Sequence, residues 1–158
     1  MRVLFLTVLL LATCVLMAQP DKEAILKPIN DLFAAMKEGD SVKAHRAFAE
    51  GSNFEMIISN RDKKPYVKVK LKDFIKAVGA PRKEKMNEVM WDAVVQQDRA
   101  FAQVWANYAF YRGNTFSHCG IDAFQLVRVG ADWKIVNLSY TVATQDCQVP
   151  QEIVDRFR

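Results

Sequence analysis

The stretch TFSHCGIDAFQLVRV (Thr115–Val129), the turn Gly130-Ala131 and the run DWKIVNLSYTVA (Asp132–Ala143) together decide the fold of this chain. Both runs are rich in β-branched and aromatic residues, and such runs joined by a short turn are typical of an antiparallel hairpin. Two similar runs, Glu88–Gln96 and Ala100–Tyr111, precede them with equally short breaks. We therefore predict a meander of four long antiparallel strands.

Helical periodicity dominates the segment before these strands. Apolar residues between Ile25 and Met36 recur three or four positions apart, and Gly39 follows as a helix-ending residue. Pro28 conflicts with an interior helical position, so we expect the helix to begin near Lys27 or to kink at the proline.

Shorter elements fill the region between the first helix and the meander. Asp40 or Ser41 is expected to cap a second helix, and Leu71–Val78 has the spacing of a third. Phe54–Ser59 and Tyr66–Lys70 are predicted strands. Helices segregated beside an antiparallel sheet indicate the α+β class. The long strands are apolar on both faces, so we expect the helices to cover one face and a second subunit, in a homodimer, to cover the other.

The N-terminus has the pattern of an export signal. Residues 1–19 form a short positive start, an apolar run and a small residue before a polar break, which predicts a secretory signal peptide followed by one domain over residues 20–158. The apolar run is too short for a membrane span, which needs about 20 residues, and no second long apolar run follows. We expect a periplasmic or secreted protein with no membrane segment after cleavage. Lipid attachment at Cys14 is the disfavoured alternative, because Thr13 precedes it and Val15–Met17 continues the apolar run.

Removal of the signal leaves Cys119 and Cys147 as an even pair, which predicts a disulfide in an oxidising compartment; two separate buried thiols are the alternative. The formal charge falls from +4 to +3 because Arg2 is lost, and this mild positive excess indicates solubility. The basic residues between Lys63 and Lys85 are scattered over a turn, a strand and a helix, so no nucleic-acid partner is expected. With few histidines and paired cysteines, we expect no metal site and no cofactor.

Several motifs, in their order and spacing, carry a resemblance to a known family: Lys27–Asn30, Gly39–Ser41, Phe74–Gly79, Val104–Tyr111, Phe116–Val127, Trp133–Ile135 and Cys147. The chain resembles the nuclear transport factor 2-like superfamily, which includes ketosteroid isomerases, and in particular its SnoaL-like and lumazine-binding branch of small exported bacterial proteins. The resemblance covers nearly all of the chain after the signal. It implies a cone-shaped, cystatin-like fold with N-terminal helices packed on a curved antiparallel sheet, an apolar pocket at the open end and usually a dimer. It does not imply one chemistry, because this fold hosts many.

The register of the last hairpin decides which side chains face the pocket. If residues 130–132 form a three-residue loop, Asp122 faces Tyr140, Phe124 faces Leu138 and Leu126 faces Val136. The same register places Cys119 opposite Ala143, with Cys147 a few residues beyond.

His118 and Asp122 are the candidate catalytic residues. They lie four apart on one strand and therefore face the same side. Asp122 would act as a general acid or base and His118 as its hydrogen-bonding partner; an exposed histidine and a purely structural aspartate are the alternative. The expected ligand pocket combines these two with aromatic residues that equally fit ordinary core or dimer contacts: Trp105, Tyr108, His118, Asp122, Phe124 and Tyr140.

Three functions remain open at this stage. The leading interpretation is an exported domain that binds a small apolar or aromatic molecule. The second is an enzyme of ketosteroid isomerase or SnoaL-like type that transfers a proton beside a carbonyl, and the third is a non-catalytic dimerisation or accessory domain. The isomerase activity itself is disfavoured, because its oxyanion aspartate would fall near Phe124 or Gln125 and the residues around Glu55 do not match its base.

Overall fold

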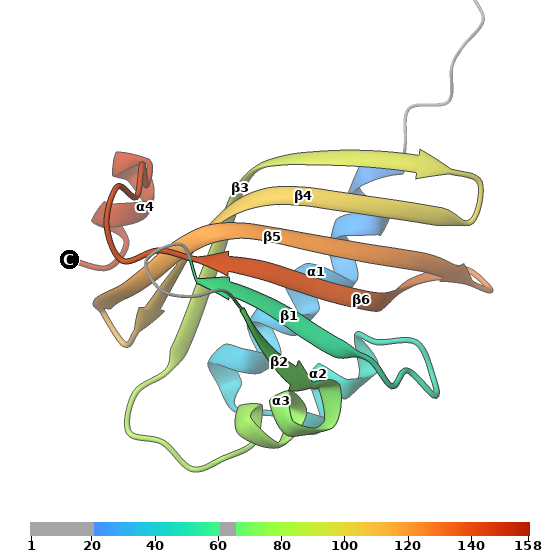
Figure 1. Ribbon diagram of the computed structural model, residues 1–158, viewed down its shortest axis with the longest axis horizontal. Coiled ribbons are helices and arrows are strands. Elements are labelled where there is room, and N and C mark those ends of the chain that lie inside the picture. Colours follow the sequence, from blue (N-terminus) through green and yellow to red (C-terminus); the bar gives the residue numbers. More distant parts are fainter. Residues whose placement is uncertain (1–20, 61–65) are drawn as a thin grey trace, which may run out of the picture.

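The computed structural model describes residues 21–60 and 66–158. In this part of the chain six strands form one sheet in the order β2-β1-β6-β5-β4-β3 (Figure 1). The strands are β1 Glu55–Asn60, β2 Val67–Lys70, β3 Met86–Asp98, β4 Phe101–Arg112, β5 Thr115–Val129 and β6 Asp132–Val142. The helices are α1 Lys22–Glu38, α2 Ser41–Arg46, α3 Leu71–Val78 and α4 Gln151–Asp155. The expected signal peptide, with Cys14, lies outside the described residues.

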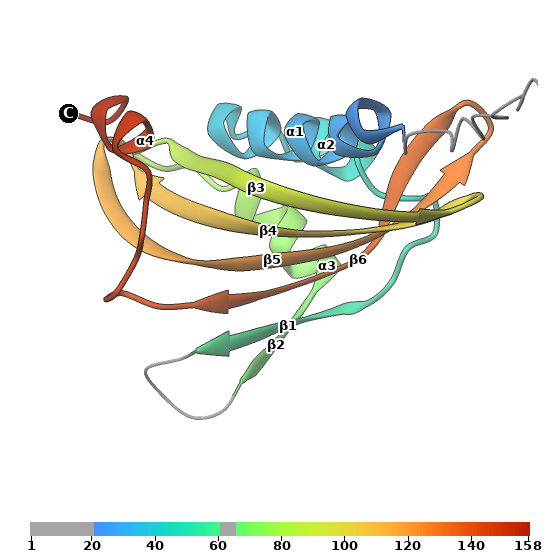
Figure 2. The same cartoon turned by 90° about the horizontal axis from the view of Figure 1, so that it is seen from above.

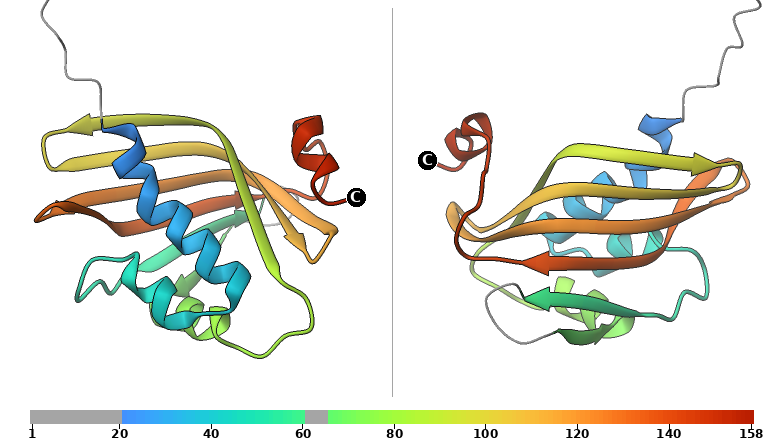
Figure 3. Two further views of the ribbon diagram at one scale, coloured as in Figure 1. Left: turned by 180° about the vertical axis from the view of Figure 1, so that it is seen from behind. Right: turned by 45° about the horizontal axis from the view of Figure 1, so that its top comes forward.

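The fold class is confirmed as α+β, and β3 to β6 form the predicted antiparallel meander. The sheet curls strongly, and α1 crosses its inner face while α3 lies inside the curl (Figures 2 and 3). One feature differs from the sequence-based expectation, because β1 pairs parallel to β6, with Ile58 opposite Tyr140. The segment between β1 and the meander, which includes α3, makes this arrangement possible because a parallel neighbour needs a crossover connection.

Helix α1 begins at Lys22, earlier than Pro28 had led us to expect, and the proline lies inside it. The reason is packing: Ile25, before the proline, and Ile29, after it, are both fully buried in the core. Burial of a side chain such as Ile25 contributes about 1.5–3 kcal/mol, which offsets much of the cost of an interior proline. Gly39 ends the helix with φ 74°, as its position predicted.

The last hairpin contains two departures from the expected register that compensate for each other. The loop is one residue shorter than predicted, because Val129 pairs with Asp132. Near the turn Leu126 therefore pairs with Ile135 and not with Val136. A bulge at Val136 then restores the expected alignment, so Asp122 does face Tyr140 and Phe124 does face Leu138, as predicted.

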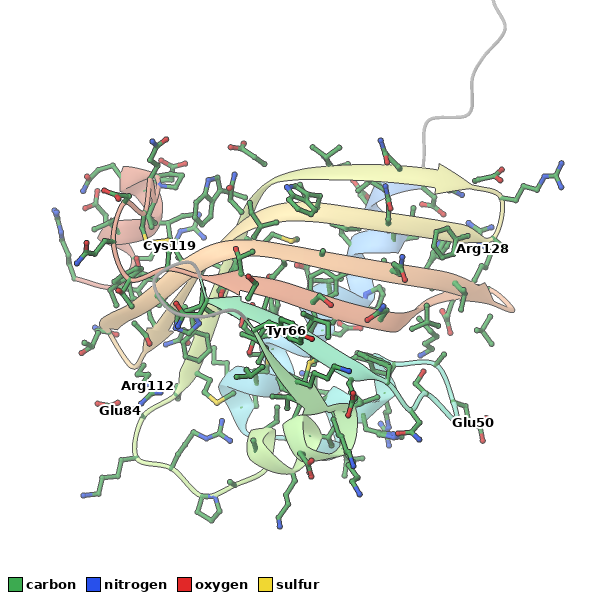
Figure 4. The ribbon with its side chains drawn as sticks, viewed as in Figure 1. Glu50, Tyr66, Glu84, Arg112, Cys119 and Arg128 are labelled. Carbon is green, nitrogen blue, oxygen red and sulfur yellow. A yellow bond between two sulfur atoms is a disulfide. The ribbon has the colours of Figure 1, made fainter. Side chains whose placement is uncertain are left out.

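The C-terminal segment is attached to the outer face of the sheet. Cys119 pairs with Ala143 and forms the predicted disulfide with Cys147, close to α4 (Figure 4). Beyond the disulfide, the Phe157 ring stacks on Tyr111 with 4.0 Å between centroids. This small outer cluster, which includes Ile153 of α4, was not predicted, and it covers only one end of the outer face.

The remaining outer face carries exposed apolar side chains. Trp105 on β4 is 57% exposed, and its partner Val94 on β3 is 56% exposed. Of the helices in the described residues, none has the length and apolar character needed to cross a membrane.

Candidate ligand-binding site

A cavity of about 240 Å³ lies between the inner face of the sheet, α1 and α3. Its apolar wall comes from both layers and consists of Leu32, Phe33, Met36, Phe74, Met86, Phe110 and Leu138. Its polar groups all project from the strands and are Glu88, Tyr108, Arg112, His118, Asp122 and Tyr140. Convergence of a few polar groups in an apolar recess is the usual form of a small-molecule site, and this one lies just below the usual size of about 300 Å³ or more.

The centre of the polar group is a pair of carboxyls. Asp122 is only 2% exposed, and its side chain hydrogen bonds to that of Glu88. Two carboxyl groups can form this bond only if one of them is protonated. Burial, followed by the charge of Glu88 and the shared bond, raises the pKa of Asp122 well above its ordinary value. Burial raises the pKa of Glu88 from 4.5 to about 7, against the lowering effect of its bond to Asp122.

Because the two carboxyls are coupled and both pKa values are raised, the pair holds a shared proton near neutral pH. The other oxygen of Asp122, Oδ2, is buried and has no hydrogen-bond partner in residues 21–60 and 66–158. A buried polar atom left in this state costs about 1–3 kcal/mol, so it is a place where a ligand group would bind favourably.

Two tyrosines adjoin the carboxyl pair. The Tyr108 hydroxyl donates a hydrogen bond of 2.8 Å to the carbonyl oxygen of Thr141, and its ring meets Tyr140 edge-on at 6.1 Å. Gly120 lies opposite Tyr108, and a Cβ there would be 2.0 Å from the Thr141 carbonyl oxygen, so only glycine allows this close approach. Burial, reinforced by the nearby carboxyls, raises the pKa of both tyrosines, which therefore stay protonated; the Tyr108 proton is already donated to Thr141, so Tyr140 is the potential donor to a ligand.

His118 closes one side of the cavity. Its ring stacks on Phe110 with 5.0 Å between centroids, and its Nδ1 lies 3.0 Å from the Ser117 hydroxyl. A bulge at Ser117 turns His118 inward while Phe116, two residues earlier, pairs with Tyr111 on the outer face. Burial, and then the positive charge of Arg112, lower the pKa of His118, so its imidazole is neutral at pH 7.

The structure brings four of the six residues predicted for the pocket to one cavity, namely Tyr108, His118, Asp122 and Tyr140. It does not bring Trp105, which is exposed on the outer face, or Phe124, which is buried in the core with its ring 6.3 Å from Phe33. The alternative interpretation had an exposed histidine and a purely structural aspartate; instead His118 is half-buried, and both it and the fully buried Asp122 line the cavity.

Glu88 is the functional residue that sequence reasoning missed. One feature of the sequence could have indicated it. In the run Met86-Asn87-Glu88-Val89-Met90, side chains alternate between the two faces of the strand, so Glu88 lies on the same face as Met86 and Met90. Among the described residues, no group of three or more His, Cys, Asp or Glu side chains is placed to hold a metal ion.

Comparison with known proteins assigns the chain to a family. Residues 20–141 match the model of a family described as "Putative lumazine-binding". The chain belongs to this family. No curated protein matches the chain.

Several solved structures are similar in fold to this family member, although their sequence identity to it is low. A protein from Novosphingobium aromaticivorans titled "Putative Scytalone Dehydratase" has a TM-score of 0.61 at 13% identity, with 82% of this chain and 89% of that chain covered. A protein of unknown function from Mycobacterium tuberculosis has a TM-score of 0.61 at 12% identity, with 85% and 84% covered. A nuclear transport factor 2-like protein from Cytophaga hutchinsonii has a TM-score of 0.60 at 15% identity, with 79% and 100% covered. The chain is therefore a nuclear transport factor 2-like domain, as its motifs indicated.

Proposed function

We propose that the cavity binds a small planar ring compound through hydrogen-bonding groups on one edge of the ring. The observation that carries this proposal is the buried Glu88–Asp122 pair with Asp122 Oδ2 left unpartnered in the described part of the chain. A ligand N–H or O–H would donate to this oxygen, and a neighbouring ligand carbonyl would accept from Tyr140. The aromatic wall formed by Phe110 and His118 suits the face of a ring.

The family description supports a ligand of this kind, because lumazine is a planar heterocycle whose edge alternates N–H donors and carbonyl acceptors. The cavity of about 240 Å³ restricts the occupant to a molecule of one or two rings. The same cavity counts against a purely structural role, which would leave the interior closed and filled with side chains.

Titration calorimetry with lumazine, pterin and xanthine, each a two-ring compound, tests the proposal. Binding of at least one compound is expected, and Asp122→Ala and Tyr140→Phe should each weaken it roughly 10-fold or more, the usual effect of losing one buried hydrogen bond to a ligand. Asp132→Ala and Tyr66→Phe make the same substitutions at exposed positions and serve as controls. Failure of all three compounds to bind, or equal binding to all the variants, would contradict the proposal.

A second candidate function is proton transfer beside a carbonyl, and the pKa of Glu88, raised to about 7, specifically favours it. A general base acts best when its pKa lies near the working pH, and Glu88 lines the cavity beside Asp122. His118 and Asp122 would then position the substrate and not abstract the proton. Deuterium exchange at the α-carbon of small cyclic ketones, followed by NMR, should be faster with the wild type than with Glu88→Gln. Exchange at the rate of buffer alone would exclude this candidate.

We also propose that the protein is exported and forms a homodimer. The disulfide between Cys119 and Cys147 supports an oxidising compartment. The exposed Trp105 and Val94 support a partner on the outer face of the sheet, because a tryptophan exposed on a sheet next to a second apolar residue is typical of an interface.

A further inference from the structure

The polar cavity adjoins a second hollow at the surface. Met86, Phe110 and Arg112 line both the cavity and this hollow, which has a volume of about 420 Å³ and is formed with the segment that precedes β3. Because the cavity and the hollow share these three residues, a substituent on the outer end of a ligand in the cavity would point toward Arg112 and the hollow. The groups around this hollow therefore contact whatever substituent the ligand carries on its outer end.

Arg112 is the cation that lines both the cavity and the hollow. The Arg82 guanidinium donates to the carbonyl oxygens of Met36, Ala77 and Val78, and so serves the ends of α1 and α3. The Arg112 side chain, by contrast, has neither an ion pair nor a hydrogen bond within residues 21–60 and 66–158. An exposed guanidinium at the mouth of a polar cavity is suited to bind a carboxylate with two parallel hydrogen bonds.

The charges near Arg112 are of both signs. Lys83 adds a second cation to the hollow, and Glu84 is the acid that lines it. Figure 4 shows Glu84 and Arg112 at the same end of the sheet, and no ion pair joins them in the described residues. Glu84 would therefore oppose an incoming anion without blocking Arg112.

The spacing along the strands sets the length of the ligand. Glu88 pairs with Phe110, and Arg112 lies two residues further along β4, so these two rows are roughly 7 Å apart. Asp122 pairs with Ala106, six residues before Arg112, so its backbone lies roughly 20 Å from Arg112 along the strand, but its carboxyl bonds that of Glu88, so the Glu88–Arg112 interval sets the ligand length. One ring or two fused rings would span this interval.

We propose that the natural ligand is a small planar ring acid, with its hydrogen-bonding edge at the Glu88–Asp122 pair and a carboxylate bound by Arg112 at the cavity mouth. This inference rests on the proposed function, to which it adds the anionic character of the ligand. It also assigns Arg112 as a residue that determines specificity between charged and neutral ring compounds.

The test uses a matched pair of probes, 6-hydroxy-2-naphthoate and its neutral analogue 6-hydroxy-2-naphthamide, in titration calorimetry with the full domain. The wild type should bind the acid roughly 10- to 100-fold more tightly than the amide. Arg112→Gln should weaken acid binding far more than amide binding and so remove most of that preference, and Arg112→Lys should retain part of it. Arg99→Gln removes an equal charge at the β3–β4 turn and should leave the preference intact, whereas Glu84→Gln should increase it.

A second measurement does not depend on any variant: affinity for the acid should fall with added salt, and affinity for the amide should not. Equal binding of acid and amide to the wild type would overturn the anion inference while leaving the proposed function in place. Failure of both probes to bind would overturn both. Acid binding that survives Asp122→Ala and Tyr140→Phe without loss would place the acid outside the cavity and would also overturn the inference.

Discussion

Replacement of Glu88 by glutamine should stabilise the folded protein at alkaline pH. In the folded state the pKa of Glu88 rises from 4.5 to about 7, so the native protein retains a proton that the unfolded chain releases. Stability contributed by such a group is present below pH 4.5 and is lost as the pH rises through about 7. The full difference corresponds to about 3 kcal/mol, and about 2–3 kcal/mol of it falls between pH 5 and pH 8.

Asp122 acts in the same direction, because its pKa is also raised. His118 acts in the opposite direction, since its lowered pKa makes the folded state lose stability on acidification through about pH 6.5. Glu88→Gln retains His118 and removes one carboxyl of the pair. The difference between the wild type and the variant therefore isolates the contribution of the pair.

Urea unfolding at half-unit steps from pH 5 to pH 8.5 measures this difference. The variant should be more stable than the wild type by about 2–3 kcal/mol at pH 8, roughly 8–10 °C in Tm, and the two should converge near pH 5. Glu84→Gln removes an exposed carboxyl and controls for the change in net charge. Parallel pH profiles for the wild type and Glu88→Gln would refute the reasoning, because they would show that Glu88 titrates alike in the folded and unfolded chains.

Three further predictions concern the scaffold of the site. Gly120→Ala should destabilise the fold by about 1–3 kcal/mol in thermal unfolding, because its Cβ would meet backbone, whereas Gly79→Ala, which meets only the flexible Ser41 side chain, should cost less. Replacing both cysteines by serine should cost about 3–4 kcal/mol in urea unfolding, the chain-entropy value for a separation of 28 residues, and an unchanged midpoint would contradict this. Trp105→Glu should convert the proposed dimer to monomer in sedimentation velocity while leaving the Tm within a few degrees; an unaltered dimer would remove the outer face as its interface.

The sequence predicts the sheet and four of the six polar groups of the cavity, and the last hairpin shows why. The pattern of apolar residues in β5 and β6 places Asp122 opposite Tyr140, and this pairing is correct although the loop is one residue shorter than predicted. The bulge at Val136 compensates for the shorter loop. The alternation of apolar and polar residues contains no signal for such a bulge. The sequence therefore predicts the pairing of Asp122 with Tyr140 but not the bulge that makes this pairing possible.

Glu88 could not be predicted, because its partner lies two strands away. Glu88 on β3 pairs with Phe110 on β4, and it reaches Asp122 on β5 only because the sheet is strongly curled. Neighbouring residues on both faces of β3 are apolar, so its alternation does not indicate which face is internal. Without Glu88, the sequence indicates an isolated Asp122 and an aromatic pocket that has few acids.

Irregularities in the strands produce the curl of the sheet. The same irregularities determine which polar side chains enter the site. Between Trp91 and Val94 the register of β3 shifts, and Asp92 there has a φ of 51°, which bends the strand. The bulge at Ser117 turns His118 inward, and the absence of a side chain at Gly120 permits the contact between Tyr108 and Thr141. Residues that regular strands would have pointed outward or kept apart are brought together at these positions.

The energetic cost of the carboxyl pair is the strongest reason to place function at these irregularities. The buried pair destabilises the fold by about 3 kcal/mol at alkaline pH. An apolar pair of similar volume would fill the same space without this loss of stability. In this interior a cavity of about 240 Å³ adjoins a buried Asp122 oxygen that has no partner among the described residues. Such an arrangement fits a ligand-binding or catalytic role, since the occupant supplies the missing hydrogen bond. The stabilisation gained by Glu88→Gln and the ligand affinity lost with Asp122→Ala are therefore two measurements of the same adaptation.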